Sequence, residues 1–157
     1  MNLGQEDRSN PNPILSELVE RSGALTAMLI TKEGFSMDEA GDTSYLNVTA
    51  MAALVAGMFS ATREVARLVG EEKFSILLQQ GETRHIHISL IDDSTMMVII
   101  FEDYQRIGLV RHEARKAATA ISNILKRPDK PELAEEIATP QFKEYALNLI
   151  DRIFETK

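Results

Sequence analysis

The chain lacks cysteine entirely, since none of its 157 residues is Cys. This absence excludes disulfide bonds, cysteine-ligated zinc and a thiol nucleophile, and it fits a reducing compartment. Basic residues are also in deficit, with 17 Lys and Arg against 24 Asp and Glu and a net charge of −7. A general nucleic-acid-binding protein needs the opposite balance. We therefore expect no nucleic acid partner and favour a partner with a basic surface.

Long apolar segments are missing as well. The run Met96–Phe101 is far too short to cross a bilayer. Residues 1–12 are polar and contain nothing like the apolar centre of a signal peptide. We therefore expect a cytoplasmic protein with no membrane insertion.

Motifs for catalysis and nucleotide binding are absent too. The sequence has no phosphate-binding loop ending in Lys-Ser or Lys-Thr, no spaced-glycine dinucleotide fingerprint, no serine nucleophile elbow and no His–Glu zinc helix. His85 and His87 alternate on one expected strand and could share a metal with Asp92 or Asp93, but side chains on a covered sheet are the favoured interpretation. We expect no cofactor, no metal, no catalytic residues and no enzyme activity of its own.

Apolar periodicity predicts the secondary structure of residues 13–126. In chain order, the expected elements are a helix over 13–23, strands over 24–31 and 35–40, a helix over 48–69, strands over 74–80, 84–91 and 95–102, and a helix over 105–126. Asn12 before Pro13 is the expected N-cap of the first helix. A five-stranded antiparallel sheet with helices on both faces would bury every apolar stripe, so the predicted class is an α/β (α+β) α-β-β-α-β-β-β-α sandwich.

A separate C-terminal segment follows this domain. Pro128 and Pro131 indicate a linker, so the domain is expected to cover 12–127, and residues 128–157 are expected to form the linker and a C-terminal amphipathic helix. The apolar face of that helix is suited to a groove on a partner. Its predicted docking residues are Phe142, Leu149, Ile150, Ile153 and Phe154.

Two stripes run along the expected helix 48–69. The stripe predicted to face the core recurs at helical spacing and holds Met51, Leu54, Val55, Met58, Thr62, Val65 and Val69. The opposite stripe holds Ala53, Gly57, Ser60, Glu64 and Arg67. A glycine in mid-helix costs about 1 kcal/mol relative to alanine, which favours an interface that another backbone approaches closely. The alternative is that these are simply small neighbours in a crowded helix.

The last helix of the domain carries a group of cations. Arg106, Arg111, Arg115 and Lys116 look like a phosphate-binding patch, but four charges on one helix are interpreted as a solvated face. Just before them, the carboxylates of Glu102 and Asp103 are expected to cap this helix, where they meet the positive end of its dipole.

Three stretches of the sequence resemble the roadblock/LC7 family. The first is Ala52–Gly57 continuing to Val65–Glu71, the second is Ile100–Glu102, and the third is Gly108–Arg111 with Arg115–Ala117 just behind. Within the family, the chain is most similar to the bacterial MglB branch. The resemblance covers about residues 14–125, and the ending 149–155 is also similar to the C-terminal tail of that branch.

The resemblance implies a homodimer in which the two long helices lie side by side and the third strands pair. It implies that this helix pair contacts the switch regions of a small Ras-like GTPase (MglA-like), in bacterial cell polarity and gliding motility. It also implies GTPase activation by repositioning of the GTPase's own catalytic residues, without an arginine finger. The partner-binding positions so implied are Ser60 and Glu64, with Ala53, Gly57 and Arg67 alongside.

The sequence departs from that pattern at Arg63 and Glu64, where MglB proteins have small residues. This departure supports an alternative, a roadblock scaffold that binds a GTPase or receptor without activating hydrolysis. A third hypothesis is a small ligand-sensing domain, because sandwiches of this size also sense metabolites.

Overall fold

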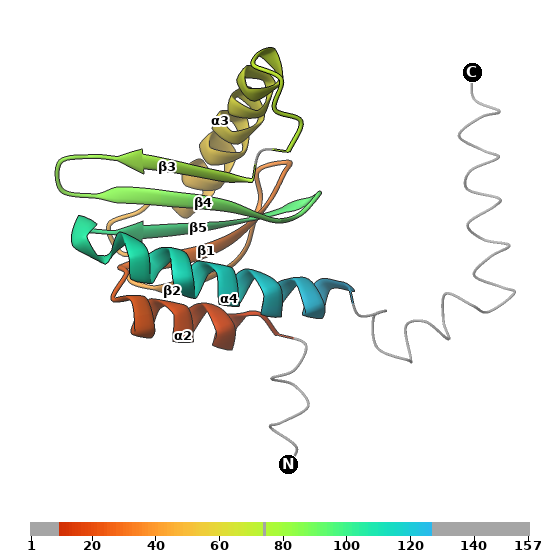
Figure 1. Ribbon diagram of the computed structural model, residues 1–157. Coiled ribbons are helices and arrows are strands. Elements are labelled where there is room, and N and C mark those ends of the chain that lie inside the picture. The colour runs from red at the N-terminus through yellow and green to blue at the C-terminus, as the bar shows by residue number, and fades with distance from the viewer. Residues whose placement is uncertain (1–9, 74, 127–157) are drawn as a thin grey trace, which may run out of the picture. The chain divides into compact units, whose positions relative to one another are not determined.

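Helices cover both faces of one five-stranded sheet in the computed structural model, which describes residues 10–73 and 75–126 (Figure 1). The chain divides into two units, residues 1–124 and 125–157. The elements are α2 (Asn12–Ser22), β1 (Thr26–Thr31), β2 (Ser36–Gly41), α3 (Val48–Leu68), β3 (Ile76–Gln80), β4 (His85–Asp92), β5 (Thr95–Phe101), the 3-10 turn η1 (Tyr104–Arg106) and α4 (Ile107–Lys126). The predicted element order and the mixed α/β class are confirmed.

The sheet has the strand order β2-β1-β5-β4-β3, and every neighbouring pair is antiparallel. Strand β5 lies at its centre, and all seven of its residues are buried. Its sequence, Thr-Met-Met-Val-Ile-Ile-Phe, is apolar on both faces of the pleat, as expected for a strand covered on two sides. Both faces of the sheet therefore need a layer of helix.

Two apolar cores result from this arrangement. On one face, Met28, Ile30 and Val98 pack in a cluster with the α3 residues Val55 and Phe59. Because side chains alternate along a strand, the neighbouring residues of β1 and β5 point to the other face, where α2 and α4 lie (Figure 1). The buried apolar residues that these two helices contribute are Leu15, Leu18, Val110, Ala114, Ala117 and Ile121.

The first helix begins differently from the prediction. Pro11 occupies the N-cap position and makes no side-chain capping bond. The Asn12 amide Nδ2 donates instead to Oδ1 of Asp38 at 2.8 Å and to the carbonyl of Glu39 at 3.0 Å. The prediction of Asn12 as N-cap is therefore wrong: its side chain ties α2 to the edge strand β2.

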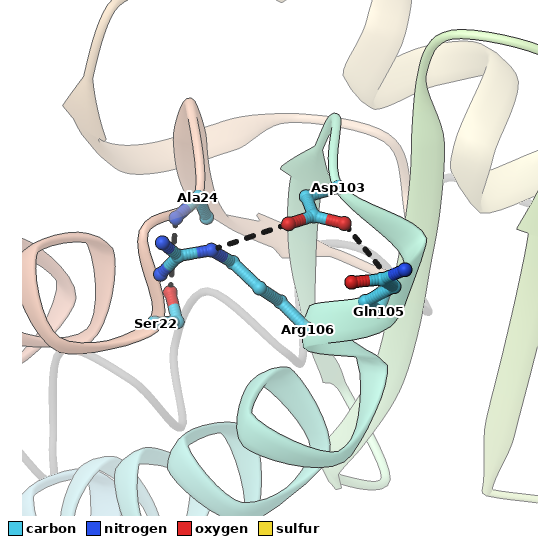
Figure 2. A network of polar contacts seen from close by, with 5 residues as sticks. All are labelled: Ser22, Ala24, Asp103, Gln105 and Arg106. Carbon is cyan, nitrogen blue, oxygen red and sulfur yellow. Dashed lines mark hydrogen bonds and ion pairs between the residues drawn. The ribbon is translucent and has the colours of Figure 1, made fainter.

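Arg106 of η1 lies close to the end of α2 (Figure 2). Gly23 closes α2 with φ +74°, and a Cβ added there would lie 2.5 Å from Nη1 of Arg106. The Arg106 Nε lies 3.7 Å from Oδ2 of Asp103, whose Oδ1 accepts from the backbone N of Gln105 at 3.0 Å. The predicted capping role of Asp103 is confirmed, with η1 as the element it caps.

Three buried polar residues follow one another at alternate positions of β4. His85, His87 and Ser89 are 3%, 1% and 7% exposed. Within the described part of the chain, Nδ1 of His85, both ring nitrogens of His87 and Oγ of Ser89 have no hydrogen-bond partner. No group of three potential metal ligands occurs among residues 10–73 and 75–126. The His85 ring packs 5.2 Å from that of Phe101.

Burial lowers the pKa of His87 below its usual 6.5, and the positive charge of Arg111 on α4 lowers it further. The neutral imidazole is therefore the form that the fold stabilises.

In the helices of residues 10–73 and 75–126, no stretch combines the length and hydropathy needed to cross a membrane.

We predict that the free energy of unfolding falls as the pH is lowered through the window that begins near the unfolded value of 6.5 and ends at the depressed pKa of folded His87. In that window the unfolded chain binds a proton at His87 and the folded chain does not, so each unit of pKa difference is worth about 1.4 kcal/mol. Urea unfolding of wild type and His87→Leu across this window measures the effect, and His87→Leu should show a smaller slope. The matched control is His112→Leu, at an exposed histidine. Equal slopes for all three proteins would contradict the prediction.

Candidate functional site

The long helix α3 is positioned by its cap and by small residues. Oδ1 of Asn47 accepts from the backbone N of Ala50 at 3.0 Å, which starts the helix at Val48. Ala52 and Ala56 are buried against the sheet. A Cβ added at Gly34, in the β1–β2 turn, would lie 3.0 Å from Cα of Ala53. The helix backbone therefore lies close to this turn.

The buried face of α3 differs from the predicted one. It consists of Ala52, Val55, Ala56, Phe59 and Ala66. Of the residues predicted to face the core, Leu54, Val65 and Val69 are 73%, 60% and 76% exposed, so their assignment to the core is wrong. The core face is rotated by about a quarter turn, because the helix is apolar on more than one side and its small alanines are what allow close approach to the sheet.

The five predicted partner-binding residues, Ala53, Gly57, Ser60, Glu64 and Arg67, are all exposed. They lie on a flank of α3, between its buried face and the exposed residues Leu54, Val65 and Leu68. The side of Gly57 is open, because a Cβ added there would meet nothing within 4 Å. No contact within residues 10–73 and 75–126 therefore explains why position 57 is a glycine.

Three of these residues line a cleft of about 370 Å³. Ser60, Glu64 and Arg67 form its helical wall, together with Arg63. The facing wall comes from two turns, which contribute Lys32, Glu33 and Asp93, and apolar atoms come from Ala56, Phe59, Leu90 and Met96. The structure does not bring Ala53 and Gly57 into this cleft.

The two turns meet because their strands are neighbours in the sheet. Lys32, after β1, donates its backbone N–H to the carbonyl of Ser94 in the β4–β5 turn at 3.0 Å. Strand β1 pairs with β5, so the turn after β1 and the turn before β5 lie at the same end. Sequence reasoning missed Lys32, Glu33 and Asp93, and the antiparallel pairing of these two strands is the signal that would have placed them together.

The cleft is charged but balanced. Lys32, Arg63 and Arg67 face Glu33, Glu64 and Asp93. Nη1 of Arg67 lies 2.8 Å from Oε1 of Glu64, and both side chains are more than half exposed. Such a surface pair is worth about 0–1 kcal/mol. Arg63 is half-buried and forms no ion pair with any described residue.

No arrangement for nucleophilic catalysis is found in the cleft. Ser60 is the only hydroxyl-bearing residue in its lining, and no hydrogen bond joins it to a base among the described residues. A nucleophile needs an adjacent base or a lowered pKa.

A second exposed feature of α3 is apolar. Leu54, Val65 and Leu68 are 73%, 60% and 86% exposed and recur at helical spacing. Ile76 on the edge strand β3 is also 47% exposed. We call Leu54, Val65 and Leu68 the apolar stripe. The predicted C-terminal docking residues Phe142, Leu149, Ile150, Ile153 and Phe154 lie outside the described residues.

Comparison with known proteins gives one family and several solved structures. Residues 12–101 match the Roadblock/LC7 domain family. The structure of Myxococcus xanthus MglB is similar to the chain with a TM-score of 0.71 and 27% identity, over 74% of this chain and 94% of that one. The gliding protein MglB from Thermus thermophilus gives a TM-score of 0.68 and 26% identity, over 75% of this chain and 88% of that one.

A further structure, described as MglB with a tetrameric arrangement, gives a TM-score of 0.66 and 27% identity, over 71% of this chain and 85% of that one. Among curated proteins, nothing matches the chain.

We predict that Gly57→Ala raises the free energy of unfolding by about 1 kcal/mol, because alanine is the better helix former and the added Cβ meets open space. Urea unfolding of the purified chain measures this change. The control is Gly23→Ala, where φ is +74° and Arg106 occupies the space, so that this substitution should destabilise the fold. A loss of stability for Gly57→Ala would show that the chain's own fold or self-association needs the glycine.

Proposed function

Because the chain belongs to the roadblock/LC7 family, we propose that it is a homodimeric regulator of a small Ras-like GTPase of the MglA type, acting in the cytoplasm. Its role is to stimulate GTP hydrolysis in bacterial cell polarity and motility, without catalytic residues of its own. The similarity to two MglB structures over most of their length supports this proposal. The observation that carries it is the exposed flank of α3, whose small residues and cleft are open to a protein surface.

Self-association is supported by the apolar stripe. Leu54, Val65 and Leu68 are exposed. A second copy that buried them would gain about 1.5–3 kcal/mol of binding free energy for each side chain. Strand β3, at the edge of the sheet, offers unpaired backbone groups. We propose that two copies meet through α3 and β3.

The dimer is tested by placing a charge in the apolar stripe. Wild type should scatter light at about twice the chain mass of 17.5 kDa. Val65→Glu should scatter at the monomer mass and keep its circular dichroism, because Val65 is 60% exposed. Leu109→Glu, at a 40% exposed residue of α4, is the control and should remain dimeric. A monomeric wild type at tens of micromolar would end the proposal.

We propose that the GTPase docks on the flank of α3 with Ser60 and Glu64 at its centre and Ala53, Gly57 and Arg67 alongside. The mechanism we propose is positioning, in which no arginine of this chain enters the partner's active site. Acceleration then comes from aligning groups that the GTPase already has.

Ser60→Arg should abolish the complex, because a long charged side chain would be desolvated in a close contact. The penalty is several kcal/mol, which corresponds to a loss of affinity of more than about 100-fold. Ser60 is exposed, so the fold should survive. Ser16→Arg, at an exposed serine of α2, is the matched control and should leave binding unchanged.

Arg67→Ala and Arg63→Ala should slow hydrolysis far less than the roughly 10³–10⁵-fold expected for removal of an arginine finger. The measurement is the single-turnover rate of GTP hydrolysis by the GTPase, with each variant of this chain at saturating concentration. A collapse of the rate for either variant, with binding intact, would mean that a finger is supplied in trans.

The alternative function is a scaffold that binds the GTPase without activating it. The charged pair Arg63 and Glu64 in the cleft wall favours this alternative, because it adds charge where the MglB pattern has small residues. If the wild-type protein binds the GTPase but does not accelerate its GTP hydrolysis, the scaffold function is the correct one. We also propose that residues 128–157, outside the described range, form a separate segment whose helix docks on the partner.

A further inference from the structure

The turn between β1 and β2 ends in a large apolar side chain that lies in water. Phe35 is 70% exposed, the most of any aromatic residue among 10–73 and 75–126, and Met37 is 47% exposed. Turns ordinarily carry small or polar residues. A single exposed apolar residue does not by itself indicate a partner. The indication comes from how this turn is held and from what lies beside it.

Hydrogen bonds fix the backbone of the turn. The N–H of Phe35 donates to Oγ1 of Thr31 at 3.1 Å, and the Phe35 carbonyl accepts from the N–H of Thr31 at 2.8 Å. The N–H of Gly34 donates to the Thr31 carbonyl at 3.0 Å, and that of Lys32 donates to the Ser94 carbonyl at 3.0 Å. The ring of Phe35 therefore projects from an ordered backbone, so a partner that covers it does not have to order the turn first.

The same turn is one wall of the cleft beside α3. Its residues Lys32 and Glu33 line that cleft together with Ser60 of α3. A Cβ added to Gly34 would lie 3.0 Å from Cα of Ala53, so the turn packs directly against the helix. A partner segment that enters the cleft therefore contacts the turn as well as α3.

The size of an ordinary interface brings Phe35 inside the proposed docking site. A specific protein interface covers about 800 Å² of each partner, which is roughly 30 Å across if it is round. Phe35 is two residues beyond Glu33, so the two Cα atoms are at most about 7 Å apart. A GTPase centred on Ser60, which lines the same cleft as Glu33, therefore reaches Phe35 as well.

A second copy of the chain is not placed to cover Phe35. Strand β2, which follows the turn, is at the opposite edge of the sheet from β3 (Figure 1). Neighbouring strands are about 4.8 Å apart, so the two edges of a five-stranded sheet are roughly 19 Å apart. Copies that meet through β3 and the apolar stripe leave the β1–β2 turn outside their contact.

We propose that Phe35 is an anchor of the GTPase-docking surface, and that its ring packs against an apolar side chain of the GTPase beside the cleft. The inference rests on the proposed function and adds a contact from the facing wall to those assigned to α3. Aromatic residues covered in an interface are among those that contribute most to affinity. Because Lys32 and Glu33 line the cleft just before Phe35, the matching GTPase surface has an apolar side chain flanked by charges of both signs.

The test measures binding of an MglA-type GTPase, loaded with a non-hydrolysable GTP analogue, by isothermal titration. Phe35→Ser should bind at least about tenfold more weakly than wild type, because it removes an aromatic anchor. Phe35→Leu keeps an apolar side chain and should stay within about threefold of wild type. The matched control is Leu109→Ser, at a 40% exposed apolar residue of α4, which should bind like wild type. Equal weakening by Phe35→Ser and Leu109→Ser would overturn the inference.

The dependence on salt identifies the kind of contact. An apolar contact is not screened by ions, so the ratio of the wild-type and Phe35→Ser affinities should be the same at low and high salt. A difference that disappears at high salt would show that the substitution acts through the charged residues of the turn, and the anchor would be wrong.

Two measurements on Phe35→Ser alone separate binding from structure. Its melting temperature should equal that of wild type, because the ring is already mostly in water. A lower melting temperature would show that the ring serves the fold and would overturn the inference. Light scattering should give the dimer mass, and a monomer mass would mean that a second copy covers Phe35.

The same titrations separate this inference from the GTPase proposal. If wild type binds the GTPase, Ser60→Arg does not, and Phe35→Ser binds as wild type does, the docking site on α3 stands and the anchor is wrong. If wild type binds no GTPase, both are wrong.

Discussion

The burial of strand β5 on both faces is the constraint on which the rest of the structure depends. All seven of its residues are covered, so one helix layer on each side of the sheet is obligatory. A helix that covers a sheet leaves its own outer side in water. The molecule therefore has two outer surfaces, one formed by α3 and the other by α2 and α4 (Figure 1).

Much of the fold was predictable from sequence because local patterns and global packing agree. The helix and strand order follows from periodicity. The apolar stripe of α4 is buried at Val110, Ala114, Ala117 and Ile121, and its last member, Leu125, is half-buried. The exceptions have physical reasons. Asn12 makes its hydrogen bonds across to β2, a partner that a local capping rule does not consider.

The candidate site was only partly predictable. Exposure of the small flank of α3 follows from the sequence, but the facing wall of the cleft comes from two turns more than 50 residues apart along the chain, at Lys32 and Asp93. Their meeting depends on strand pairing, which no local pattern contains. The orientation of α3 was missed because large apolar residues were assumed to face inward, whereas Ala52 and Ala56 do so and Leu54 and Val65 do not.

The hydrogen bonds between Asn12 of α2 and strand β2 bear on where a further strand can add to the sheet. Strand β2 carries Asp38 and Glu39 at one edge, and Asn12 donates to the carboxylate of Asp38 and to the backbone carbonyl of Glu39. Strand β3, at the other edge, has the sequence Ile-Leu-Leu-Gln-Gln and carries no charge. Carboxylates on an edge discourage a further strand, and neutral residues permit one. A sheet that can be extended at one edge only forms a closed pair with a second copy and then stops, whereas two receptive edges would let copies add without limit into a fibre.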